Sequence, residues 1–187
     1  MVRIASGWYA HLLLLEDIVA GRERRPFWAS FEIALTEHEK RLGEPPVVIR
    51  VSRTFRAAPE DVFDAWISDE HIPLWMFAGE AGELVRADND VRPGGAFVFT
   101  SLEESGEIDH AGTWTELARP QRLAWNYSLP DYAPFDVDRV TIEIARRRGG
   151  CEAVLVHEMK PVWADYSARA EAGWAELFEE IAARVEN

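Results

Sequence analysis

The chain has 187 residues, of which 48% are hydrophobic, so it can bury one sizeable core but is short for two complete domains of ordinary size. Thirty-three acidic residues against twenty basic ones give a formal net charge of −13. This sign argues against nucleic acid and anionic membranes as partners, because both are bound by neutralising phosphates. We therefore look for a small-molecule or protein partner.

The location is suggested by a single cysteine, Cys151, which cannot form an internal disulfide. No charged and apolar N-terminal leader is recognisable, and the longest apolar run is far below the roughly 20 residues that span a bilayer. We expect a cytoplasmic protein without a membrane-spanning segment.

The first 46 residues predict an N-terminal helical extension. Two helices are expected there, each with an apolar stripe at helical spacing: Trp8, Leu12, Leu15 and Val19 on the first, and Phe27, Phe31, Leu35 and Leu42 on the second. Gly43 to Pro46 breaks the second helix and forms a stiff linker.

Residues 47–187 predict a separate α+β domain. A strand at Val47–Phe55 is followed by a helix that starts at Ala58 to Asp61, and then by a short helix from Ser68 to Trp75. A long amphipathic helix from about Asp165 to Val185 ends the chain. Between these helices the pattern predicts antiparallel strands at Gly82–Ala87, Ala96–Leu102, Gly112–Leu117, Arg122–Leu129, Val137–Arg146 and Glu152–Met159. We expect the last helix to fill the concave side of the sheet.

Several motifs occur in a characteristic order in this region. They are Arg53 to Trp66, Trp75, Val91 to Phe97, Gly112, Glu116, Pro120 and Arg122 to Trp125. In this order they resemble the homologues of the heat-shock-protein-90 ATPase activator, within the START-like, SRPBCC superfamily. The resemblance covers about Val47 to Asn187 and implies the helix-grip fold, a curved antiparallel sheet around a long C-terminal helix. Pro93 stands where the family usually has valine, which should stiffen the turn.

The extension carries a second resemblance. Gly7-Trp8 and the stripe that follows have the same offsets as Gly173-Trp174 and its stripe, and the first helix looks like the closing helix of another domain of the family. The alternative is two unrelated amphipathic helices that share a Gly-Trp by chance. In either case the apolar face must pack somewhere. We expect it on the outer face of its own sheet, beside Val154 and Val156, or on a neighbouring chain as a homodimer.

No motif for catalysis, a metal or a cofactor is recognised. The five histidines are dispersed, and neither a Gly-x-Ser-x-Gly elbow nor a phosphate-binding glycine loop occurs. His157 shares a strand face with Leu155 and Met159, so it either offers one hydrogen bond to a cavity or is a satisfied core histidine. We expect solvated roles for His110, Glu107 and Glu158. Arg92 is expected to pair with Asp88.

Aromatic residues are the remaining signal, since eight tryptophans and nine phenylalanines require either a bulky core or a ligand cavity. A packed core and a cavity explain the pattern equally well, and the resemblance favours the cavity because relatives often enclose apolar ligands there. The residues expected to line it are Trp66, Trp75, Phe97, Phe99, Trp114, Trp125, Tyr127, His157, Met159, Trp174 and Phe178.

Three functions remain open. The leading hypothesis is a module that binds a small apolar, aromatic or lipid-like molecule. The second is a cyclase, dehydratase or hydrolase of the superfamily, which needs two convergent titratable groups where the sequence offers one candidate, His157. The third, suggested by the family name, is a co-chaperone-like protein interaction module. The pattern favours a ligand-binding protein over an enzyme.

Overall fold

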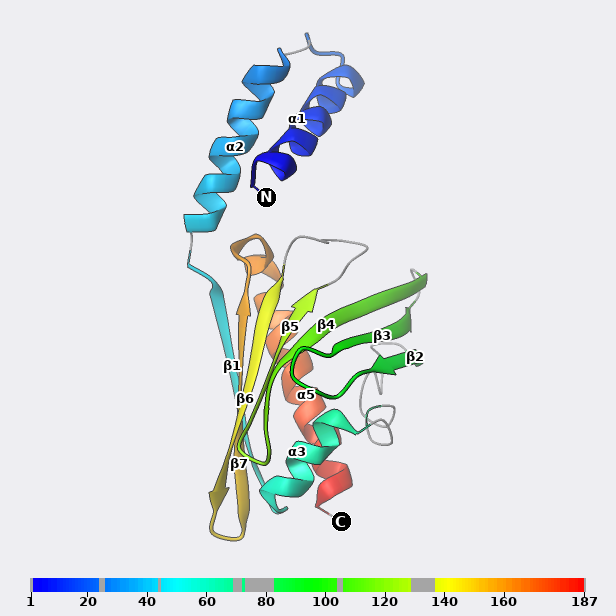
Figure 1. Cartoon of the computed structure of the whole chain (residues 1–187), viewed down its shortest axis with the longest axis vertical. Coiled ribbons are helices and arrows are strands. Elements are labelled where there is room, and N and C mark those ends of the chain that lie inside the picture. The colour runs from blue at the N-terminus through cyan, green and yellow to red at the C-terminus, as the bar shows by residue number, and fades with distance from the viewer. Residues whose placement is uncertain are drawn as a thin grey trace. The chain divides into compact units, whose positions relative to one another are not determined.

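The computed structural model describes residues 2–23, 26–43, 45–68, 72, 83–103, 106–128 and 137–186 (Figure 1). The chain divides into two compact units, Met1–Pro45 and Pro46–Asn187. The first unit is a pair of packed helices, α1 (Val2–Val19) and α2 (Phe27–Gly43). Among the described residues, no helix is long and apolar enough to cross a membrane.

The second unit is built on one antiparallel sheet of seven strands in the order β1-β7-β6-β5-β4-β3-β2. Its strands are β1 (Val47–Phe55), β2 (Glu83–Asn89), β3 (Ala96–Glu103), β4 (Gly106–Ala118), β5 (Arg122–Ser128), β6 (Asp138–Arg147) and β7 (Gly150–Met159). Helix α3 (Pro59–Ile67) follows β1, and η1 (Pro161–Tyr166) leads into the long α5 (Ser167–Val185). Figure 1 shows α3 and α5 together on one side of the sheet. The predicted α+β, helix-grip architecture is confirmed.

Helix α3 forms where the sequence provides a helix start. Pro59 occupies the first turn, and Glu60 and Asp61 place negative charge at the positive end of the helix dipole. Its buried stripe includes Val62, Phe63 and Trp66. The predicted short helix from Ser68 to Trp75 lies largely outside the described residues.

Strand alternation sets the inner face of the sheet. In β7 the odd-numbered residues, from Cys151 to Met159, are buried, and the even-numbered ones are half-exposed. In β6 the even-numbered residues Val140, Ile142 and Ile144 are buried, as the period of two requires. Strand β4 starts at Gly106, six residues before its predicted start, and this extension brings Glu107 and His110 into the sheet.

Helix α5 covers this inner face. Phe178 and Ile181 are fully buried, and Trp174 and Val185 pack on the same core from its margin. The C-terminal end of α5 is held by Glu186, whose carboxylate accepts a hydrogen bond from the backbone N–H of Arg56 at 3.0 Å and pairs with the guanidinium of that residue. These contacts lower the pKa of Glu186, chiefly through the backbone hydrogen bond.

The turn between β2 and β3 differs from its predicted pairing. Arg92 pairs with Asp90 at 2.8 Å, whereas Asp88 pairs with Arg86. Strand β2 continues through Asn89, so Asp88 lies in the strand and Asp90 is the acidic residue that lies in the turn with Arg92. The predicted Arg92–Asp88 pair is therefore wrong.

Candidate functional site

The interior between sheet and α5 is lined by aromatic rings from four elements. The ring of Trp66 on α3 lies 5.9 Å from Trp125 on β5 and 6.4 Å from Trp174 on α5, measured between ring centroids. Trp66 also meets Phe178 edge to face at 5.9 Å, and Trp125 meets Trp114 on β4 in the same way at 5.5 Å. These are favourable aromatic geometries, so the four tryptophans and Phe178 form one connected cluster.

A second pair of rings lies on the part of the sheet farther from β1. Phe97 and Phe99 on β3 stack at 5.0 Å with an interplanar angle of 19°. The Phe97 ring extends over Gly112 on β4, where an added Cβ would come within 2.2 Å of the ring. Glycine at this position therefore lets the phenylalanine ring lie against the β4 backbone.

The imidazole of His157 is buried and has partners on both nitrogens. The indole Nε1–H of Trp174 donates to its Nδ1 at 3.0 Å, and its Nε2 lies 3.2 Å from Oδ2 of Asp138. Because an indole can only donate, Nδ1 is the acceptor, and Nε2 carries the proton that is donated to Asp138. The other Asp138 oxygen accepts from the backbone N–H of Lys160 at 2.9 Å. His157 is thus the satisfied interior histidine, and it orients Trp174 on α5.

A second polar line crosses three strands beside the stacked phenylalanines. Nδ1 of His110 lies 2.7 Å from the hydroxyl of Tyr127, and its Nε2 lies 3.1 Å from the buried hydroxyl of Ser101. Ser101 in turn lies 3.3 Å from Glu103, a carboxylate that can only accept when ionised. One direction of donation satisfies the whole line: Tyr127 donates to His110, His110 donates to Ser101, and Ser101 donates to Glu103. We refer to these four residues as the Tyr127–Glu103 line.

Burial shifts the pKa values of two residues of this line, His110 and Tyr127. It lowers the pKa of His110 from 6.5 to about 4, with a smaller opposing effect from Asp109. Burial also raises the pKa of Tyr127. Both side chains are therefore neutral at neutral pH, which is the state that the direction of donation requires. The solvated role expected for His110 is wrong, because the sheet continues to Gly106 and turns this residue toward Ser101 and Tyr127.

Most of the predicted ligand-binding residues meet in this interior. Trp66, Phe97, Phe99, Trp114, Trp125 and Phe178 belong to one buried cluster, against which Tyr127 and Trp174 pack. His157 joins it through its edge-to-face contacts with Trp174 at 5.7 Å and Tyr127 at 6.2 Å. Met159 is buried at the end of β7, opposite Val47, and is not part of that cluster. Trp75 lies outside the described residues.

Four polar residues of this interior were not predicted: Asn89, Ser101, His110 and Asp138. Ser101 and His110 share the inner face of their strands with predicted site residues, and Asp138 shares that of β6 with the buried Val140, so the two-residue period indicated the face of all three. Asn89 accepts a hydrogen bond from the Trp114 indole at 2.9 Å and donates to the backbone carbonyl of Ile67 at 3.2 Å. No local pattern indicates this link between β4, β2 and the end of α3.

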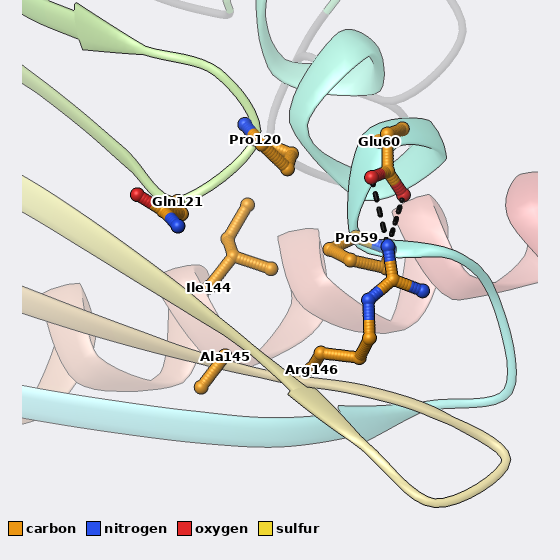
Figure 2. A pocket seen from close by; sticks show the side chains of 7 residues that line it. All are labelled: Pro59, Glu60, Pro120, Gln121, Ile144, Ala145 and Arg146. Atoms are coloured by element: carbon orange, nitrogen blue, oxygen red, sulfur yellow. Dashed lines mark hydrogen bonds and ion pairs between the residues drawn. The ribbon is translucent and has the colours of Figure 1, made fainter.

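A pocket of about 440 Å³ lies on the surface where α3 starts, beside the turn from β4 to β5 (Figure 2). Its lining includes Pro59, Pro120, Gln121 and Ile144. Across it, both carboxylate oxygens of Glu60 accept from Nη2 of Arg146, at 2.8 and 3.0 Å. None of the predicted ligand-binding residues lines this pocket, and its two charged groups bind each other. The described residues also contain no cluster of His, Cys, Asp or Glu suited to hold a metal ion.

An antiparallel sheet closed by a long C-terminal helix over an aromatic interior defines a helix-grip protein. The sequence profile of the family described as "Activator of Hsp90 ATPase homolog 1-like protein" matches residues 56–186, so the chain belongs to this family. The predicted family membership is confirmed. A comparison with curated protein sequences finds no match.

Solved structures share the fold. Protein CV1439 from Chromobacterium violaceum has a TM-score of 0.66 and 24% identity over 75% of this chain and 97% of its own. An AHSA1-like protein from Aeromonas hydrophila has a TM-score of 0.61 and 22% identity over 75% and 92% of the two chains. SA2116 from Staphylococcus aureus, described as of unknown function, has a TM-score of 0.66 and 16% identity over 78% and 96%.

Proposed function

We propose that the helix-grip unit binds a small apolar or aromatic molecule that carries one polar group, between the inner face of the sheet and α5. The observation that carries this proposal is the Tyr127–Glu103 line, set beside the stacked rings of Phe97 and Phe99. Apolar side chains would fill that face without needing partners, whereas buried polar groups are costly unless all are satisfied. Mostly apolar surroundings with a few oriented polar groups are the usual composition of a ligand site.

The polar end of the ligand belongs at Tyr127. Its hydroxyl proton is directed to His110, and the phenolic oxygen keeps lone pairs that can accept a hydrogen bond. A ligand hydroxyl, which can donate, therefore suits this position better than a carboxylate, which can only accept when ionised. Among the described helices, α5 packs chiefly on β1 and α3 on β6 and β7. The ligand is accordingly assigned to the β3, β4 and β5 part of the inner face.

Trp174 borders the proposed site, and a hydrogen bond to His157 fixes its position. Its indole donates to His157, which is itself anchored by Asp138. This three-residue relay, together with edge-to-face contact to Trp125 at 6.2 Å, fixes the ring orientation on α5. A rigid ring of this kind supplies apolar area without a large loss of side-chain entropy on binding.

Catalysis is the second candidate, because His110 and Tyr127 are two titratable groups within 2.7 Å of each other. An efficient general acid or base has a pKa near the working pH. The pKa of His110 is lowered to about 4 and that of Tyr127 is raised, so both shifts move away from neutrality. This supports a hydrogen-bonding role for the pair and ranks catalysis below binding.

We assign the protein to the cytoplasm on the basis of its cysteine. Cys151 is buried, and burial raises the pKa of its thiol to about 11. A thiol of this kind is neither a nucleophile nor a disulfide partner at neutral pH.

The experiment compares 2-naphthol with naphthalene by isothermal titration calorimetry. Both should bind saturably, with 2-naphthol tighter by about five- to tenfold, the value of one net hydrogen bond. Tyr127→Phe should abolish this preference while preserving naphthalene binding, and Tyr9→Phe, which alters a tyrosine of the separate helical unit, is the matched control. Absence of saturable binding to either probe, together with a loss of about 3 to 5 kcal/mol of stability in Trp174→Ala, would identify a filled core and refute the proposal.

A further inference from the structure

Helix α1 presents its predicted apolar stripe to the outside of its own unit. Trp8 is 71% exposed, Leu12 59%, Leu15 55% and Val19 87%. Single exposed apolar residues are ordinary on protein surfaces, but a continuous apolar face along a helix marks an interaction site. We call these four residues the α1 stripe.

The reason for this exposure is that α1 packs on α2 through its other side. Ala10, Leu14 and Asp17 of α1 are buried, and so are Ser30 and Ala34 of α2. At 3.6 residues per turn, the centre of this small-residue face lies roughly opposite the α1 stripe. The two helices therefore pack on each other through this side, and the described residues of the unit leave the larger apolar face of α1 exposed.

Helix α2 carries further exposed apolar residues. Trp28 is 71% exposed and packs edge to face against Phe27 and Phe31, with ring centroids 5.3 and 5.8 Å away. His11, next to the α1 stripe, lies 5.0 Å from Phe27 and joins the two helices on this side. With Ile18 included, the α1 stripe exposes on the order of 600 Å², which approaches the roughly 800 Å² that one partner contributes to a standard protein interface.

Charge favours a second copy of the same unit. Met1–Pro45 contains six basic and seven acidic residues, a net charge of −1, which leaves −12 for Pro46–Asn187. Two copies of the first unit can approach without appreciable repulsion. The outer face of the sheet is a poorer partner, because its positions on β1, β7 and β6 include Arg50, Glu152, Glu158, Arg139 and Glu143.

We propose that two chains form a symmetric dimer in which the two α1 stripes pack antiparallel, so that the helix pairs join through their α1 helices. The spacings within the stripe are four, three and four residues, so it is the same when read in either direction. A two-fold axis between Leu12 and Leu15 then places Trp8 opposite Val19 of the partner subunit, a large residue against a small one. An antiparallel pairing of the two α1 helices gives the two-fold symmetry that is usual in homodimers.

Sedimentation velocity tests the dimer on the full chain. The wild-type protein should sediment at twice the mass of one chain. The double substitution Leu12→Asp with Leu15→Asp should weaken association at least a hundredfold and leave the unfolding of Pro46–Asn187 unchanged. Ile33→Asp is the control, because Ile33 is also exposed but lies two residues from Phe31 and points to another side of α2. A wild-type monomer at all concentrations, as docking on the same chain would give, overturns the proposal.

Disulfide trapping tests the antiparallel register. A mixture of Trp8→Cys and Val19→Cys chains should form a cross-linked heterodimer under mild oxidation, whereas each variant alone should not. In the proposed dimer, two copies of either position are separated by about 16 Å along the helix axis, too far for a disulfide. Buried Cys151 does not compete. The antiparallel arrangement would be refuted if each variant cross-linked with itself and the mixture contained no cross-linked heterodimer.

Discussion

Helices α1 and α5 carry the same apolar spacing and meet opposite environments. In α5, Phe178 is 1% exposed and Ile181 is fully buried against the inner face of the sheet. In α1, the corresponding Leu12 and Leu15 are more than half exposed. The comparison shows that an amphipathic pattern encodes a face to be covered and does not encode what covers it. The predictions below use equivalent positions of the two helices.

The largest difference is expected between Phe178 of α5 and the equivalent Leu12 of α1, each of which lies four residues after the tryptophan of a Gly-Trp pair. Phe178→Ala should cost about 3 to 5 kcal/mol of unfolding free energy, because it opens a void among Phe55, Trp66 and the sheet. Leu12→Ala should leave the stability of the helix-grip unit within about 0.5 kcal/mol. Urea unfolding followed by tryptophan fluorescence measures both. Equal losses in the two variants would show that the α1 stripe packs on the helix-grip unit itself.

A smaller difference is expected at the tryptophans. Trp174→Phe removes the donor to Nδ1 of His157 and should cost about 1 to 3 kcal/mol, since the imidazole nitrogen stays buried. Trp8→Phe, at an exposed position, should change the stability of the helix-grip unit by less than about 0.5 kcal/mol. Nitrogen chemical shifts of His157 report the lost bond directly. An unchanged His157 spectrum in Trp174→Phe would contradict the relay from Trp174 to Asp138.

A further expected effect depends on pH. The pKa of His110 is about 4 in the folded chain against 6.5 in the unfolded chain, so the unfolded state binds more protons between these values. Stability should therefore fall as pH decreases from about 6.5 to about 4, and His110→Gln should reduce this slope. Urea titrations of wild type and His110→Gln at several pH values measure the free energy of unfolding and hence the two slopes. His11→Gln, an exposed histidine of α1, controls for the change in net charge, and an equal slope in wild type and His110→Gln would contradict the burial of His110.

Local patterns were sufficient for the fold and for most of the interior. The strand pattern and the amphipathic last helix predicted the antiparallel sheet and the helix that covers it, because side-chain direction repeats every two residues in strands and every 3.6 in helices. The ordered motifs indicated the family. Trp125 and Tyr127 were both expected to line the interior, and the structure has them there beside Trp114 and His157.

Partners across strands could not be predicted in this way. Ser101, His110 and Tyr127 come together from β3, β4 and β5, and their contact depends on strand register and on where β4 begins. The irregularity between Trp114 and Glu116 also changes the register along β4. A period identifies a face and leaves open which residues of neighbouring strands lie within hydrogen-bond distance.

The sequence by itself determined the two helices of the first unit, the antiparallel sheet, the closing helix and the aromatic character of the interior, because each follows from local spacing. Only the tertiary structure decided that both nitrogens of His157 are occupied, that His110 is half-buried with a lowered pKa, and that α1 packs on α2 through Ala10, Leu14 and Asp17. These features arise from contacts between segments far apart in the chain. Their energies depend on distance and burial, which no local pattern contains.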